Sequence, residues 1–170
     1  MSVASHIVAG SMPKLASVRP AEKLSITVTW GEGPRAHRTE TIDLSPLIYS
    51  FKFYKKLRKD RALFATVHLV EDGEAIAWGD DDSIDMAATS IERLAEEALT
   101  PDELRQFLDR EDLTQEAAAA MLGYSRRQIA HYLAGDKPIP RVFALAFHAL
   151  AARRVADKAN LVSWPSRPAT

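Results

Sequence analysis

Two patterns of apolar and polar positions divide this chain of 170 residues. From Leu24 to Trp30, apolar and polar residues alternate, which is typical of a strand with one buried face. After about residue 88, apolar residues instead recur every three or four positions, the spacing of amphipathic helices. The patterns predict an α+β fold: a first part with antiparallel strands and short helices, and a second part that is all α.

The first part is expected to be a small domain built on five strands. They are predicted at about 14–19, 24–30, 35–44, 65–70 and 74–78. Asp72-Gly73 is a strong signal for a hairpin turn between the last two strands, because such turns need residues that tolerate a positive φ. Short helices are expected after Ser45-Pro46 and around residues 54–57.

The boundary between the two parts is expected near residue 98, where one helix ends and another begins almost at once. Thr89 is expected to cap the first helix, with Glu92 as its partner. Thr100 is expected to cap the second, with Pro101 at its first position and Glu103 completing a capping box. We therefore expect domains at 1–98 and 99–154, followed by a polar tail at 155–170.

Residues 113–135 carry the signals of two short helices joined by a tight turn. Thr114 is placed to cap the first helix, and Gly123 follows its last apolar residue. Ser125 is placed to cap the second helix, and Gln128, three residues on, would complete a capping box. The inner faces are expected to be formed by residues at helical spacing: Ala118, Met121 and Leu122, then Ile129, Tyr132 and Leu133.

With the preceding helix, and one or two apolar helices expected at 141–154, this arrangement resembles the lambda-repressor-like (Cro/C1, XRE-type) DNA-binding domain. The resemblance runs over about residues 100–154. It is carried by Leu113-Thr114-Gln115, Met121-Leu122-Gly123, Ser125, Ile129, Leu133 and Gly135. It implies five short helices, of which the second and third form a helix-turn-helix that places the third in the major groove.

The resemblance also implies which side chains face DNA. They are Gln115, Ser125, Arg126, Arg127, Gln128, His131, Lys137 and Arg141. Arginine can bond both acceptors on a guanine edge, so an arginine pair favours sites that contain G. Gln128 could read a base or be occupied as the capping partner, while Lys137 and Arg141 suit phosphate contacts. The alternative for each basic residue is that it is simply a solvated charge.

Charge limits what one copy of this domain can do. The whole chain has a net charge of −1, and residues 101–154 carry eight Lys/Arg against seven Asp/Glu. Contacts to phosphates supply much of the affinity for DNA, so a domain this close to neutral has a weak electrostatic attraction. A homodimer would double the contacts and fix the spacing of two half-sites.

The first domain resembles the uncharacterised family called domain of unknown function 2442, over about residues 14–90. The resemblance rests on a strand ending in a Gly-containing turn, Asp43-Leu44-Ser45-Pro46-Leu47, Leu57, Phe64, and a hairpin closing on Trp78 with Ile84-Asp85 after it. Trp78-Gly79 stands where that family is expected to have Trp-Pro. The whole chain then looks like a fusion of this domain with a lambda-repressor-like domain, and the match implies a fold without an activity.

Residues 52–61 hold six Lys/Arg with Phe53 and Tyr54 among them. Two interpretations are open: an accessory nucleic-acid surface, or a solvated basic helix whose aromatic side chains lie in the core, which is the favoured one.

Enzyme, cofactor and metal signatures are missing from the sequence. There is no Cys, and the five His show no zinc-ligand spacing. Asp81, Ser83, Asp85 and Glu92 fall at positions 1, 3, 5 and 12 of a calcium-binding loop, but Met86 stands where that loop needs Gly. No apolar run approaches a membrane span, and the N-terminus does not read as a signal peptide, so a cytoplasmic protein is expected.

The sequence thus predicts a transcriptional regulator that binds double-stranded DNA as a homodimer, without enzymatic activity, cofactor or metal. The first domain would pair subunits, bind a partner protein or sense a ligand. The alternative is a protein-interaction module, of the antitoxin kind, for which DNA contact is secondary or absent.

Overall fold

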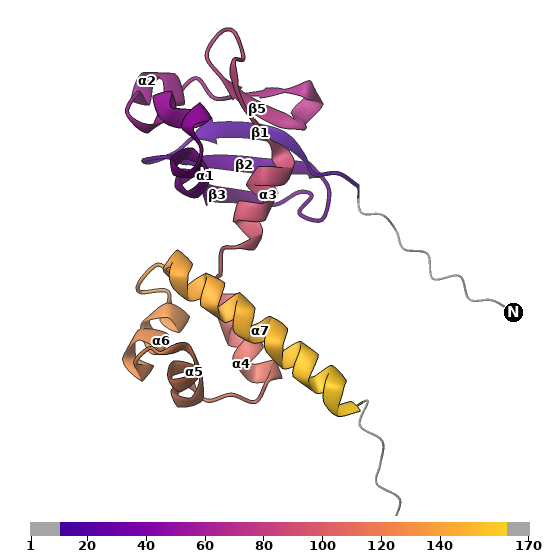
Figure 1. The fold of residues 1–170 in the computed structure, drawn as a ribbon, viewed down its shortest axis with the longest axis vertical. Coiled ribbons are helices and arrows are strands. Elements are labelled where there is room, and N and C mark those ends of the chain that lie inside the picture. The colour runs from indigo at the N-terminus through magenta and orange to yellow at the C-terminus, as the bar shows by residue number, and fades with distance from the viewer. Residues whose placement is uncertain (1–10, 163–170) are drawn as a thin grey trace, which may run out of the picture. The chain divides into compact units, whose positions relative to one another are not determined.

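The structure, a computed structural model, describes residues 11–162, which form two compact units, 11–96 and 97–162 (Figure 1). The first unit contains β1 (Lys14–Pro20), β2 (Ser25–Glu32), β3 (Thr39–Asp43), α1 (Ser45–Ser50), the 3-10 helix η1 (Lys52–Arg58), α2 (Arg61–Phe64), β4 (His68–Val70), η2 (Glu71–Gly73), β5 (Ala75–Trp78), β6 (Ile84–Ala87) and α3 (Ala88–Glu96). The second contains α4 (Pro101–Arg110), α5 (Gln115–Leu122), α6 (Arg126–Ala134) and α7 (Arg141–Val162). The predicted α+β class is confirmed.

Two antiparallel sheets make up the strand content of the first unit, in the orders β1-β2-β3 and β4-β5-β6. The alternation predicted for β2 is confirmed, because Ile26, Val28 and Trp30 are fully buried while the residues between them are partly exposed. Ile26 lies opposite Ile42 of β3 in the ladder, which places both on the core side of the sheet.

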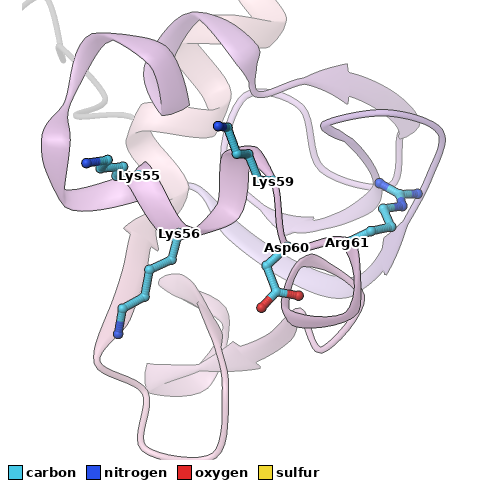
Figure 2. Close-up of a pocket in the computed structure, with 5 residues that line it drawn as sticks. All are labelled: Lys55, Lys56, Lys59, Asp60 and Arg61. Carbon is cyan, nitrogen blue, oxygen red and sulfur yellow. The ribbon is translucent and has the colours of Figure 1, made fainter.

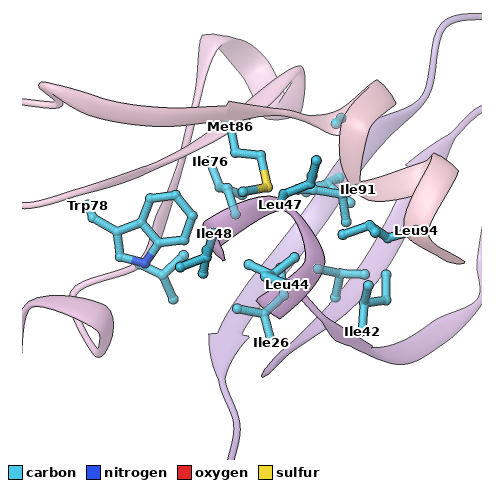
Figure 3. Close-up of a cluster of buried hydrophobic side chains, with 14 of the residues drawn as sticks. Ile26, Ile42, Leu44, Leu47, Ile48, Ile76, Trp78, Met86, Ile91 and Leu94 are labelled. Atoms are coloured by element: carbon cyan, nitrogen blue, oxygen red, sulfur yellow. The ribbon is translucent and has the colours of Figure 1, made fainter. Parts of the chain in front are cut away.

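Helices α1 and α3 bring further apolar side chains against these strands (Figure 3). Leu47 and Ile48 of α1 and Ile91 and Leu94 of α3 point into the same cluster as Ile26. Burying a side chain of this size contributes about 1.5–3 kcal/mol relative to leaving it exposed. The short helices therefore close the core of the first unit.

The predicted hairpin at Asp72-Gly73 is confirmed, with both residues at positive φ, 55° and 83°. Its turn packs on β1: a Cβ added to Gly73 would lie 2.2 Å from the carbonyl oxygen of Leu15. Lys14, next to Leu15, makes ion pairs of 3.2 Å with both Asp72 and Glu74. This position thus needs glycine both for its conformation and for the absence of a side chain.

Several predicted boundaries in the first unit were wrong. Strand β3 begins at Thr39 rather than residue 35, because residues 34–37 form a turn. Strand β4 begins at His68, because Thr66 still continues the turn that ends α2, donating its N–H to the Leu63 carbonyl at 3.0 Å. Strand β6 was not predicted.

The predicted cap at Thr89 was also wrong. Helix α3 follows β6 directly and begins at Ala88, whose N–H donates to the carbonyl of Glu74 at 2.7 Å. Glu92 is therefore not a capping partner: its Oε1 is buried and accepts no hydrogen bond from the residues described. Burial raises the pKa of Glu92 above its ordinary value, and the nearby charge of Glu96 adds to the shift.

The second unit has its own core, made by all four of its helices. Its members are Leu99, Leu104, Phe107, Leu108, Ala118, Ala119, Ile129, Tyr132, Phe143, Ala144 and Phe147. Phe143 of α7 packs edge-on against Tyr124 and Tyr132, with ring centroids 4.9 and 5.0 Å apart. These contacts attach the segment around α6 to the long helix α7.

The resemblance implied five short helices, but residues 97–162 contain four, of which α7 is long. The expected polar tail was wrong for residues 155–162, which continue α7; residues 163–170 lie outside the described part. Glu111, after α4, explains the extension, because it accepts hydrogen bonds from Arg154 and Lys158, each at 2.9 Å. None of the helices in residues 11–162 has the length and hydropathy needed to cross a membrane.

Gly73→Ala is expected to lower the free energy of unfolding of the first unit by about 2–4 kcal/mol, through left-handed strain and the collision with Leu15. Gly79→Ala is the matched control: its φ is also positive, at 84°, but the nearest atoms lie 3.5 Å away or more, so the loss should be only about 1–2 kcal/mol. Urea denaturation followed by the fluorescence of buried Trp30 and Trp78 measures both. Equal losses would contradict the proposed collision.

Glu111→Gln is expected to lower the melting temperature of the second unit at neutral pH. It should also make that melting temperature depend less on pH in the acid range. Hydrogen bonds from Lys158 and then Arg154 lower the pKa of Glu111 from 4.5 to about 2, so its stabilisation is complete above pH 4.5 and lost as the pH falls towards 2. Melting temperatures by circular dichroism across this range test the effect. Asp109→Asn is the control, because Asp109 is exposed and makes no ion pair with any residue described; an identical pH profile for both variants would refute the role of Glu111.

Candidate nucleic-acid interface

Helices α5 and α6 meet in a tight turn whose local hydrogen bonds agree with the predicted caps. Thr114 Oγ1 accepts from the N–H of Ala117 at 3.1 Å, and α5 ends at Gly123, which has a left-handed φ of 72°. The capping box of α6 is complete: Ser125 Oγ accepts from the N–H of Gln128 at 3.2 Å, and Gln128 Oε1 accepts from the N–H of Ser125 at 3.0 Å. The first residue of α6 is therefore fixed.

Buried side chains hold α6 against the rest of its unit. Ile129 is fully buried and Tyr132 nearly so, as predicted. Arg105 of α4 donates to the carbonyl of Leu133 at 2.8 Å, which satisfies a backbone group at the end of α6. With one side anchored in this way, the opposite side of α6 faces outwards.

The predicted inner face of α5 was partly wrong. Ala118 is buried as expected, but Met121 is 45% exposed and Ala119 is buried in its place. The buried and partly buried side chains of α5 are those at 115, 117, 118, 119 and 122, so the helix is rotated from the expected orientation, towards Ala119 and away from Met121. The rotation leaves Gln115, at the first position of α5, partly buried beside the core face.

Arg126 and Arg127 occupy the first turn of α6, and both are exposed. Arg126 Nε lies 2.7 Å from Oε1 of Glu116 on α5, so this guanidinium has an acidic partner within the motif. Arg127 makes no ion pair with any residue in 11–162. Of the two arginines, Arg127 is the one whose charge is not already compensated by a neighbour.

Two other predicted contact residues, Ser125 and Gln128, form the capping box of α6. Ser125 Oγ and Gln128 Oε1 lie 3.0 Å apart, besides the backbone bonds that each accepts. Of the two interpretations of Gln128, the structure therefore supports the capping partner. His131, one turn further along α6, is partly buried and has its Nδ1 3.3 Å from Oδ2 of Asp136.

The predicted phosphate contacts, Lys137 and Arg141, differ in their surroundings. Lys137 is exposed and forms no ion pair within the described chain, whereas Arg141 is paired with Glu97. Carboxylates therefore face Arg126, His131 and Arg141, and the sequence reasoning did not assign those pairs. Glu116 lies within residues 113–135 and Asp136 directly follows them, so their proximity to the basic residues in the sequence was a signal that could have been used.

Residues 104–146 match a family model described as helix-turn-helix. Over these residues the chain is similar to helix-turn-helix domains of the Cro/C1 type. No curated protein matches the chain significantly. Among solved structures, the chain is similar to "Putative DNA Binding Protein NE0471" from Nitrosomonas europaea ATCC 19718, with 24% sequence identity, 79% of this chain and 83% of that chain covered, and a TM-score of 0.41. The resemblance of residues 14–90 to domain of unknown function 2442 stays a prediction.

Proposed function

We propose that this protein binds double-stranded DNA with α6 as the reader helix and acts as a transcriptional regulator. The observation that carries the proposal is the exposed Arg127 in the first turn of α6, within a matched helix-turn-helix. The first turn of a reader helix is the part that approaches base edges in the major groove. An arginine there that forms no ion pair with any residue in 11–162 is suited to bond the two acceptors of guanine.

The other residues of this surface take different parts in the proposal. Ser125 and Gln128 act indirectly, by fixing the start of α6. Gln115 is at the first position of α5, and His131 lies one turn further along α6. Arg126 contacts a phosphate after exchanging its bond to Glu116, an exposed ion pair of the kind that is worth less than about 1 kcal/mol. Lys137 contacts a phosphate without having to give up a partner, and Arg141 must first release Glu97.

The proposal includes a homodimer, because a nearly neutral unit lacks charge to hold DNA alone. One side of α7 supports it. Side chains at three- and four-residue spacing along that helix are apolar or small and exposed: Val142, Leu145, Ala149, Ala152 and Ala156. The opposite side of α7 already fills the core with Phe143 and Phe147. A helix that is apolar on both sides is expected to be covered on both, here by α7 of a second copy.

Selection of duplexes from a random pool tests DNA recognition directly. We expect a preferred sequence containing G, and Arg127→Ala should reduce its advantage over a scrambled duplex roughly 5- to 100-fold, since a bidentate guanine contact is worth about 1–3 kcal/mol.

Lys137→Gln should weaken binding to the selected and the scrambled duplex equally. It should also reduce the slope of log affinity against log salt concentration by about one. Glu116→Gln should strengthen binding, roughly two- to fivefold, because it removes a carboxylate beside the phosphates.

Arg153→Gln is the control for charge alone, because Arg153 is exposed on α7 and forms no ion pair in the part of the chain that the structure describes. It should leave the preference for the selected duplex unchanged. The proposal fails if no sequence is enriched, or if Arg127→Ala binds the selected and scrambled duplexes with the wild-type ratio.

Light scattering after size-exclusion chromatography tests the dimer. The wild-type chain should have the mass of two copies, and the double variant Val142→Glu with Leu145→Glu should be a monomer, since these side chains are 67% and 41% exposed and the change introduces charge into the interface. Val155→Glu makes the same kind of change off the stripe, at an equally exposed residue, and should leave the dimer intact. A monomeric wild type, or a double variant that stays dimeric, would exclude this interface.

A further inference from the structure

A basic and aromatic surface lies on the first unit, far along the chain from the helix-turn-helix. It comprises residues 49–59, which span the end of α1 and the 3-10 helix η1, and we call it the lysine–aromatic surface. Phe51 and Phe53 are each 53% exposed and Tyr49 is 61% exposed. The favoured sequence interpretation of residues 52–61, a basic helix with Phe53 and Tyr54 in the core, is therefore wrong for Phe53, whereas Tyr54 is partly buried against the core.

The two arginines of this region hold the backbone in place. Arg58 donates to the carbonyls of Ile48 at 3.0 Å and Phe51 at 3.1 Å, which are backbone groups at the end of α1. Arg61 donates to the carbonyls of Ala21 and Lys23, between β1 and β2. Both guanidinium groups are thus used within the fold, and they keep the lysine–aromatic surface attached to the sheet.

The four lysines are used differently. A 3-10 helix has three residues per turn, so side chains three apart line up. Tyr54 and Leu57 form the inward row of η1, which leaves Lys52 and Lys55 in one outward row and Phe53 and Lys56 in the other. Lys52, Lys55, Lys56 and Lys59 are all exposed, and none makes an ion pair with a residue in the described range.

Lys55, Lys56 and Lys59 border an open hollow together with Asp60 and Arg61 (Figure 2). The carboxylate of Asp60 is already engaged, because it accepts the N–H of Leu63 at 2.8 Å and caps α2. Phe51 and Phe53 pack edge-on against Tyr54, with ring centroids 6.4 and 5.1 Å away. Ammonium groups that form no ion pair with a described residue therefore lie beside solvent-facing rings.

We propose that the lysine–aromatic surface binds single-stranded nucleic acid, with the lysines on phosphates and Phe51 and Phe53 stacking on bases. Lysines alone would suit any polyanion. The exposed rings favour a single strand, because only unpaired bases present their faces for stacking, and such stacking tolerates any sequence. The site is separate from α6, so it does not depend on the function proposed for the helix-turn-helix.

The test uses the full chain carrying Arg126→Ala and Arg127→Ala, so that binding through α6 does not obscure the result. Fluorescence anisotropy with an oligothymidylate of about 20 nucleotides, longer than a typical single-strand site, should show binding that weakens with salt. Replacing Lys52, Lys55, Lys56 and Lys59 with Gln should lower the affinity roughly tenfold or more and reduce the salt slope by about 0.7 for each phosphate that a lysine no longer neutralises. Phe51→Leu with Phe53→Leu should lower the affinity roughly fivefold or more and leave the slope unchanged.

A charge-matched control replaces four other exposed basic residues, Arg19, Arg38, Arg93 and Arg153, with Gln. The control variant loses the same charge as the lysine variant. It should therefore retain most of the affinity for oligothymidylate if the four lysines form the binding site. Circular dichroism confirms that each variant is folded. The proposal is overturned if the control loses as much affinity as the lysine variant, or if the phenylalanine variant binds like its parent, which would leave only charge. Binding to vesicles that contain phosphatidylserine but not to oligothymidylate would also overturn it, in favour of a membrane surface.

Discussion

The reciprocal hydrogen bonds between Ser125 and Gln128 are the interaction on which the reader surface depends. They fix the residue at which α6 begins, and the left-handed Gly123 just before them fixes the direction from which the chain enters. The positions of Arg126 and Arg127 follow from that start, since they are the next two residues. A start displaced by one residue would turn both arginines by about 100° around the helix axis.

The same interaction explains why this part of the structure could be predicted from the sequence. A capping box joins residues three apart, so its members are visible side by side in the sequence. The alternation in β2 and the Asp72-Gly73 turn are equally local, and both were found correctly. The exposure of Arg126 and Arg127 followed as well, because Ile129 and Tyr132 determine which side of α6 is buried.

What the sequence left open depends on contacts between residues far apart. Glu111 bonds to Arg154 and Lys158, more than 40 residues later, and no local signal shows that the helix from Arg141 extends to meet it. Strand β6 also alternates, with Ile84 and Met86 buried, but four residues are too few for a periodic pattern to be recognised. In α5, apolar residues occur on several sides, so packing decided that Ala119 rather than Met121 is buried.

A basic side chain of this protein can bind a polyanion only after it breaks the hydrogen bonds or ion pairs that it already makes. Arg58 donates to the carbonyl of Ile48 at the end of α1, and freeing it would remove that hydrogen bond, at a cost of about 1–3 kcal/mol for a buried group. Arg126 would release only an exposed carboxylate, which water can solvate at once, so the exchange for a phosphate is nearly balanced. Arg127, Lys137 and the four lysines of the lysine–aromatic surface have no ion pair to break among residues 11–162. Net charge therefore underestimates both surfaces, because the sum also counts carboxylates that are bound elsewhere, as Glu40 is by Arg35 and Glu111 by Arg154 and Lys158.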